Sequence, residues 1–428
     1  MRRRRTAADW RLIAREVGRF LLLALPKAGG GVFLLALNLL LVRVLDTAAF
    51  GRFAYCMTLI LLADAIIGAP FDLAVIKLSG EGRAAGAATP MAAARAALHV
   101  KLAVTAGLCV VAAGLDALVG APEDRGGLLA ATLFAITSML VVRSVQVTLQ
   151  VSGRFLAYAS IESLQLVLRV AFIAAAVLLL PPGAALAIAA LGAGALIAAA
   201  FGGFGLQPGL LRISGRGDLP YARLSGVAFW VLATTAVGAL IGRLDVLALG
   251  WLAPASGIGL FTAGQVIASI AELAGSYLAV FLTPRLVGAM RAGTTATLFR
   301  RVQGALLALA GAGLVAALLI GPLVLPVVLP PAYALSGTVA LILMPGTLAA
   351  FATVPLALPL VLFRHKRALL LLDLALFPFV AAAYWLAIGQ SGIIGAAIVT
   401  TSVMLLRSAA VQGIALWSLR RPLTAEHE

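Results

Sequence analysis

Several ionisable side chains lie inside long apolar segments, where a charge is unusual and can do chemistry. Asp64 and Asp72 are eight residues apart in one such segment, and Glu272 lies in another. A charge at the centre of a bilayer costs at least about 2.5–3.5 kcal/mol on insertion scales, so it usually faces a cavity or a partner. Acids placed in this way could carry a proton or a sodium ion. We therefore predict ion-coupling roles for Asp64, Glu272 and Asp245, although Asp245 could instead pair with Arg243.

Basic side chains form a second set of candidates within the apolar segments. In a polar cavity they would receive an anionic group of a solute. We predict substrate-binding roles for Lys27, Arg143, Arg169 and Arg407. Two structural alternatives stay open: polar residues can pair between helices, and side chains near helix ends, such as Arg143 and Asp373, can extend to the lipid headgroups.

Two stretches of the chain repeat each other at a constant spacing. Residues 51–78 align without gaps on residues 259–286. Gly51 then matches Gly259, and Asp64 matches Glu272 in the middle of an apolar helix, whereas Asp72 matches Val280. Acids at matching positions are more informative than matching leucines, and they indicate an internal duplication.

The composition predicts a helical membrane protein. Of the 428 residues, 63% are hydrophobic and only 11% are charged, too few charges for the surface of a soluble protein. Apolar runs of about 18 residues or more recur along the chain, and each can cross a bilayer as a helix. The net charge of +16 arises from short basic clusters between these runs, a pattern that sets membrane topology. Nucleic acid is therefore not an expected partner.

Catalytic and metal-binding motifs are missing from the sequence. Two cysteines and three histidines form no ligand spacing, and no phosphate-binding loop or nucleophile motif occurs. We predict a protein that is not an enzyme, with no cofactor and no metal.

Twelve transmembrane helices are predicted, with both termini in the cytoplasm. Basic residues concentrate in the connections expected on the cytoplasmic side; one such cluster comprises Lys77, Arg83, Arg95 and Lys101. The expected spans are 20–42, 53–78, 92–119, 127–150, 160–180, 184–206, 225–242, 258–283, 298–320, 338–363, 368–388 and 391–418.

The spans divide into two halves that enter the membrane in the same direction. A basic tail (1–19) precedes a first lobe of six helices (20–206), and a cytoplasmic linker (207–224) leads to a second six-helix lobe (225–418) and a short tail (419–428). The fold class is therefore all-α and polytopic, with two parallel lobes related by an axis along the membrane normal. Solute sites in such proteins tend to lie near the midplane between the halves.

Two segments resemble a known family. Residues 41–51 carry a basic residue and a short turn that ends in Phe50-Gly51, which resembles the first hairpin of polysaccharide-transport flippases. These belong to the multidrug/oligosaccharidyl-lipid/polysaccharide exporter superfamily. The stretch from Arg243-Leu244-Asp245 to Gly259-Leu260-Phe261 resembles the start of the family's second half. Twelve helices in two six-helix lobes also match.

The resemblance implies a function. Such proteins move an undecaprenyl-diphosphate-linked oligosaccharide from the cytoplasmic to the outer leaflet of the bacterial inner membrane, alternating between two states coupled to an ion gradient. Lys27, Arg169 and Arg407 would then meet the diphosphate. The expected partners are the lipid-linked oligosaccharide, membrane lipids, a proton or sodium ion, and a polysaccharide polymerase.

Three other functions remain open. Lipid II flippases share the fold but commonly have fourteen helices. Multidrug antiporters share fold and helix count, and their cationic substrates would suit Asp64, Asp72 and Glu272. A membrane-embedded transferase that acts on a lipid-linked sugar would need a catalytic group facing one leaflet, and no long polar loop offers one.

Overall fold

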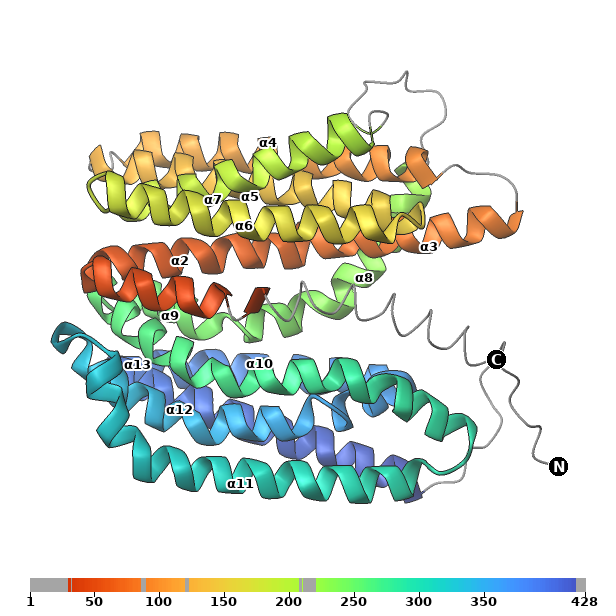
Figure 1. Ribbon diagram of the computed structural model, residues 1–428, viewed down its shortest axis with the longest axis vertical. Coiled ribbons are helices and arrows are strands. Elements are labelled where there is room, and N and C mark those ends of the chain that lie inside the picture. Colours follow the sequence, from red (N-terminus) through yellow and green to blue (C-terminus); the bar gives the residue numbers. More distant parts are fainter. Residues whose placement is uncertain are drawn as a thin grey trace. The chain divides into compact units, whose positions relative to one another are not determined.

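The computed structural model consists of helices and short connections over the residues it describes, which are 30–31, 33–85, 90–119, 123–207, 210 and 221–420. No strand occurs among them. The first helix labelled in Figure 1, α2 (Thr47–Ala63), continues through a π-helical turn, η1 (Asp64–Gly68), into α3 (Ala69–Ala85). Long apolar runs become helices because lipid offers the backbone no hydrogen-bond partners, so each N–H and C=O must be paired inside its own segment.

Nine helices in the described residues are long and apolar enough to cross a membrane, and two shorter apolar helices occur at Phe33–Val44 and Tyr221–Ala233. The protein is therefore an all-α, multi-pass membrane protein. The total of twelve spans and the cytoplasmic location of both termini remain predictions.

Two compact units divide the described chain. The first contains Leu59–Ala236 and the described residues before Asn38, and the second contains Asn38–Thr58 and the described residues from Val237 onward. Helix α2 therefore begins in the second unit and ends in the first.

The first unit is built mainly from four long helices after α3. In it, α5 packs chiefly on α7, and α6 also packs on α7. The bounds are α4 (Pro90–Val119), α5 (Glu123–Val151), α6 (Phe155–Leu179), α7 (Ala184–Ala200), the π-helical η2 (Phe201–Leu206) and α8 (Tyr221–Ile241), whose last residues belong to the second unit.

The second unit is centred on α10 and α12, which pack closely on each other. Helix α13 packs on α12 and α9. The bounds are α9 (Leu244–Leu252), α10 (Ala255–Arg291), α11 (Thr295–Val328), the short η4 (Pro331–Tyr333), α12 (Ala334–Thr353) and α13 (Ala357–Arg420).

Local sequence explains where α2 begins. The Asp46 carboxylate accepts hydrogen bonds from the backbone N–H groups of Ala48 and Ala49, both at 2.8 Å. These N–H groups have no partner inside the helix, so an aspartate at this position stabilises the helix start.

Prolines account for one difference from the predicted spans. The expected span 338–363 is interrupted, because α12 ends at Thr353 and α13 begins at Ala357. Pro355 lies in this break and has no N–H to continue the helical hydrogen bonding. Helix α13 also leaves helical geometry at two places, His365 and Gly392, and the φ of 57° at Gly392 favours glycine. His365 lies between the expected spans 338–363 and 368–388, and Gly392 is the second residue of the expected span 391–418.

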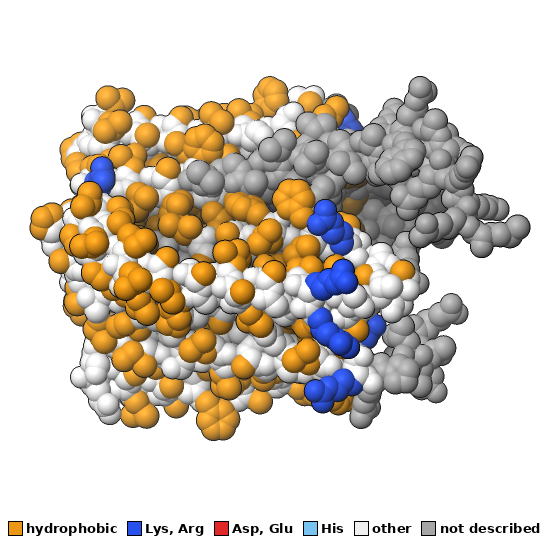
Figure 2. All heavy atoms as spheres, turned by 60° about the horizontal axis from the view of Figure 1, so that its bottom comes forward, with side chains coloured by type: hydrophobic (Ala, Val, Ile, Leu, Met, Phe, Trp, Pro, Cys, Tyr) orange, Lys and Arg blue, Asp and Glu red, His pale blue; other side chains and the backbone are white. Residues whose placement is uncertain are grey.

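The surface has the polarity of a membrane protein. On the face shown in Figure 2, hydrophobic side chains cover the length of the helices, and Lys and Arg side chains gather close to one end. Basic side chains at one end are suited to anionic lipid headgroups.

Candidate functional site

Four charged side chains meet in the first unit. Nε of Arg143 lies 3.3 Å from Oδ1 of Asp64 and 3.5 Å from Oδ2 of Asp72. The ammonium group of Lys101 donates to Oδ1 of Asp72 and, at 3.2 Å, to the hydroxyl of Ser144. We call Asp64, Asp72, Lys101 and Arg143 the ionic cluster. Its two acids and two bases cancel in charge.

The π-helical turn brings the two acids to one base. At 3.6 residues per turn, residues eight apart on an α-helix are about 80° out of alignment. The wider turn at Asp64–Gly68, in which the N–H of Ala69 bonds to the carbonyl of Asp64, takes up about one residue and brings Asp64 and Asp72 nearly into line. Pro70, two residues after this turn, lacks an N–H donor, which favours a local departure from α-helical bonding.

Lys101 is a functional candidate that the sequence analysis assigned to a cytoplasmic connection, and that assignment is wrong. Its side chain is 0% exposed and lies eleven residues inside α4, counting from Pro90 to Lys101. A buried ammonium needs an acidic partner, and Asp72 supplies it. The signal was present in the sequence, since Lys101 lies well inside the expected span 92–119.

Arg169 is the basic candidate that has no acidic partner among the residues the structure describes. It lies near the middle of α6, and its Nε is buried with no hydrogen-bond acceptor among the described residues. Gly194 of α7 packs against the backbone of Arg169, where an added Cβ would lie 3.0 Å from the Arg169 nitrogen. One turn earlier, Gln165 accepts a hydrogen bond from Gln146 at 3.0 Å.

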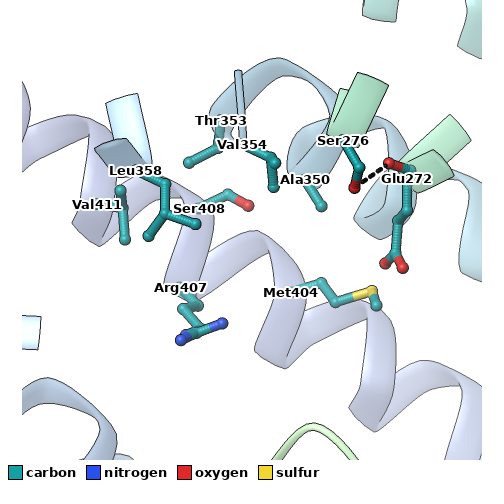
Figure 3. Close-up of a pocket in the computed structure, with 10 residues that line it drawn as sticks. All are labelled: Glu272, Ser276, Ala350, Thr353, Val354, Leu358, Met404, Arg407, Ser408 and Val411. Atoms are coloured by element: carbon teal, nitrogen blue, oxygen red, sulfur yellow. Dashed lines mark hydrogen bonds between the residues drawn. The ribbon is translucent and has the colours of Figure 1, made fainter. Parts of the chain in front are cut away.

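A cavity of about 240 Å³ in the second unit contains Glu272 and Arg407 in its lining. Figure 3 shows Glu272 and Arg407 at opposite sides of the lining, with Met404 between them. The hydroxyl of Ser276 donates to the backbone carbonyl of Glu272 at 3.0 Å.

Arg407 is held by Asp373 through two parallel hydrogen bonds. Its Nε and Nη2 lie 3.0 and 3.1 Å from the two carboxylate oxygens of Asp373. Asp373 is buried, so the expectation that it extends to the headgroups is wrong. Paired arginine and aspartate of this geometry bind each other strongly, and the charge of Arg407 is largely neutralised.

Asp245 and Lys27 complete the predicted site residues. The carboxylate of Asp245 is buried, and it accepts hydrogen bonds from the N–H of Val246 at 2.7 Å and from Gln265 at 2.8 Å. Lys27 lies outside the described residues. The described part of the chain holds no group of three or more His, Cys, Asp or Glu side chains that could bind a metal ion.

The predicted site residues therefore lie in separate places in the structure. Asp64 and Arg143 meet in the ionic cluster, while Glu272 and Arg407 share a cavity in the other unit. Sequence reasoning did not identify Lys101 and Asp373 as the partners of these charges.

Solved structures of several transporters share this fold. The chain is similar to a lipid II flippase, MurJ, in an inward closed conformation, with a TM-score of 0.73, 10% identity, and coverage of 94% of this chain and 88% of that one. It is also similar to an outward-facing multidrug resistance MATE family transporter of the MOP superfamily, with a TM-score of 0.62, 13% identity, and coverage of 94% and 95%. A MATE transporter from Vibrio cholerae in a bent form matches with a TM-score of 0.58, 15% identity, and coverage of 94% and 97%.

Sequence comparison identifies the family. A search of curated proteins finds no match. The family model described as "Polysaccharide biosynthesis protein" matches residues 32–290, which is more than half of the chain. This region includes the ionic cluster, Arg169, Asp245 and Glu272. The chain thus belongs to the polysaccharide biosynthesis protein family, and its fold is that of the MOP superfamily.

Proposed function

We propose that this protein is a flippase that moves an undecaprenyl-diphosphate-linked oligosaccharide from the cytoplasmic to the outer leaflet of the bacterial inner membrane. Membership of the polysaccharide biosynthesis family supports a role in surface polysaccharide assembly. The similarity to structures of a lipid II flippase and of a multidrug transporter supports transport by alternating access. We also propose that the transmembrane helices form two lobes of six helices, one from each half of the sequence.

Arg169 is the observation that carries the proposal. A diphosphate needs a cation that no protein acid has already neutralised. Arg143 is shared by Asp64 and Asp72, and Arg407 is bonded to Asp373. Among the basic candidates that the structure describes, Arg169 is left to bind an anion. A guanidinium presents several N–H donors in a plane, a geometry that suits phosphate oxygens.

The acids provide candidates for ion coupling. Glu272 lines a cavity in the second unit, and no described residue is bonded to its carboxylate oxygens. Asp64 and Asp245 are more constrained, because Arg143 contacts the first and Gln265 bonds to the second. Of these three acids, we propose Glu272 as the first candidate for binding a proton or a sodium ion.

Substitution of Arg169 tests the proposal in cells. In a strain that lacks the gene, we expect loss of surface polysaccharide and accumulation of lipid-linked repeat units inside the cell. Wild-type protein should restore export, and Arg169→Ala should lower export about tenfold at equal protein level. Arg301→Ala, at an exposed arginine in the first turns of α11, is the matched control and should export normally.

Multidrug antiport is the alternative function, and the acid facing the cavity favours it. If the deletion strain makes normal polysaccharide and becomes sensitive to cationic drugs, the antiporter function replaces the proposed one. Accumulation of lipid II in that strain would instead indicate that this protein transports lipid II.

A further inference from the structure

One face of α6 changes from polar to apolar at Arg169. Residues on this face follow at alternating spacings of four and three, which keeps them aligned on a helix. The polar half contains Tyr158, Glu162, Gln165 and Arg169, and the apolar half contains Phe172, Ala176 and Leu179. Such a division matches a molecule with a polar head and a hydrocarbon chain.

The apolar half of this face borders a groove of about 520 Å³ within the first unit. This volume lies in the range of about 300–1,000 Å³ that is common for ligand pockets. Every residue that lines the groove is apolar. Its lining combines small side chains, such as Ala189 and Ala193 of α7, with large ones, such as Phe134 of α5 and Phe172 of α6.

The groove and Arg169 lie next to each other. Phe172 lines the groove and is three residues beyond Arg169, about 4.5 Å along the helix. Leu179 lines the groove seven residues further on, so the groove follows α6 for about 10 Å. Gly194, at the level of Arg169, follows directly after Ala193 of the groove.

We propose that this groove holds the isoprenoid chain of the transported lipid while Arg169 binds its diphosphate. The inference rests on the proposed function and adds the location of the hydrocarbon chain. Charge complementarity selects the occupant, because an apolar groove alone would accept any lipid chain. Arg169, about one turn along α6 from Phe172 of the groove, has a buried Nε with no acceptor among the described residues and calls for an anionic head. The groove accommodates a few isoprene units next to the diphosphate, and the remainder of the chain extends into the bilayer.

Photolabelling of the purified full-length protein in phospholipid nanodiscs tests the proposal. The probe is an isoprenoid diphosphate with a photoreactive group in the isoprene units nearest the diphosphate, and the corresponding isoprenoid alcohol is the matched probe without charge. We expect the diphosphate probe to label residues of the groove on α6 and α7, and Arg169→Ala to lower this labelling about tenfold. The alcohol should label the groove at least tenfold less than the diphosphate.

Variants within the groove separate chain binding from head binding. Ala193→Phe, at a half-buried position of the lining, should occupy the groove and lower labelling at least fivefold. Ala171→Phe, at an exposed position of α6 outside the groove, adds the same side chain and should leave labelling unchanged. Thermal unfolding measurements on both variants check that they fold.

Two results would overturn the inference. If both probes label the groove equally and Arg169→Ala has no effect, the groove holds bulk lipid chains. If the diphosphate probe labels another part of the protein, the chain binds there. In either case, export of lipid-linked oligosaccharide by the wild-type protein would leave the proposed function intact, whereas normal polysaccharide in the deletion strain would refute that function independently of the labelling.

Discussion

Gly51 of α2 and Gly259 of α10 lie against each other, and each packs on the partner helix at an equivalent point. A Cβ on Gly51 would overlap the carbonyl oxygen of Ala255, and a Cβ on Gly259 would overlap that of Thr47. The same difference of 208 positions separates Gly51 from Gly259 and Thr47 from Ala255. The helices from the two repeats thus meet about a local two-fold axis, which supports the internal duplication inferred from the sequence.

Alanine at either glycine should destabilise the protein, because a backbone carbonyl cannot move away as a side chain can. Overpacking typically costs about 1–3 kcal/mol, occasionally more. We expect Gly51→Ala and Gly259→Ala each to lower the thermal unfolding midpoint in detergent. Gly288→Ala, in α10 with open space around it, is the control. An unchanged midpoint in both variants would show that the helices do not cross in this way.

The ion pair between Lys101 and Asp72 should be a structural requirement. Removal of one partner of a buried pair typically costs about 3–5 kcal/mol, because the other charge is left buried. We expect Lys101→Met to lower the yield and unfolding temperature of the protein strongly. Adding Asp72→Leu should restore much of the loss, since apolar residues often replace a buried pair without cost.

The surface pair formed by Lys77 and Glu81 provides a control for that experiment. These side chains are 61% and 46% exposed and lie 3.9 Å apart, and such pairs contribute about 0–1 kcal/mol. Lys77→Met should leave the unfolding temperature nearly unchanged. Equal effects at Lys77 and Lys101 would contradict the buried position of Lys101.

A double-mutant cycle should decide between structural and substrate-binding roles for Arg407. We expect the effects of Arg407→Ala and Asp373→Asn on stability to be non-additive, with a coupling of about 0.5–3 kcal/mol, as is usual for residues in contact. If Arg407 instead binds the substrate on its own, Arg407→Ala will abolish export while Asp373→Asn leaves it intact.

Neutralisation of Glu272 should uncouple transport from the ion gradient. Glu272→Gln keeps the size of the side chain but removes its ability to bind a proton or to attract a sodium ion. In vesicles with an imposed gradient, we expect transport by this variant to depend little on the gradient. Glu81→Gln, at an exposed carboxylate, should retain the full dependence. An unchanged gradient dependence in Glu272→Gln would remove this residue from the coupling mechanism.

Features that depend on local sequence could be predicted well. The helical class follows from the apolar runs, and the equivalence of Gly51 and Gly259 follows from their register. The partners of the charges could not be predicted, because they come from other helices. Asp72 meets Lys101 of α4, and Arg407 meets Asp373 across a separation of 34 residues. Hydropathy shows that a charge is buried, but only the packing of helices shows which opposite charge it meets.

The π-helical turn at Asp64–Gly68 has a consequence for the history of the two repeats. The corresponding part of α10 is continuous α-helix from Ala255 to Arg291. Beyond Asp64, therefore, residues aligned in sequence no longer occupy equivalent positions in space. The counterpart of Asp72 is displaced by about one residue from Val280. The two repeats therefore share their sequence register but not their helical register, and only the copy with the π-helical turn has a second acid, Asp72, aligned with the first.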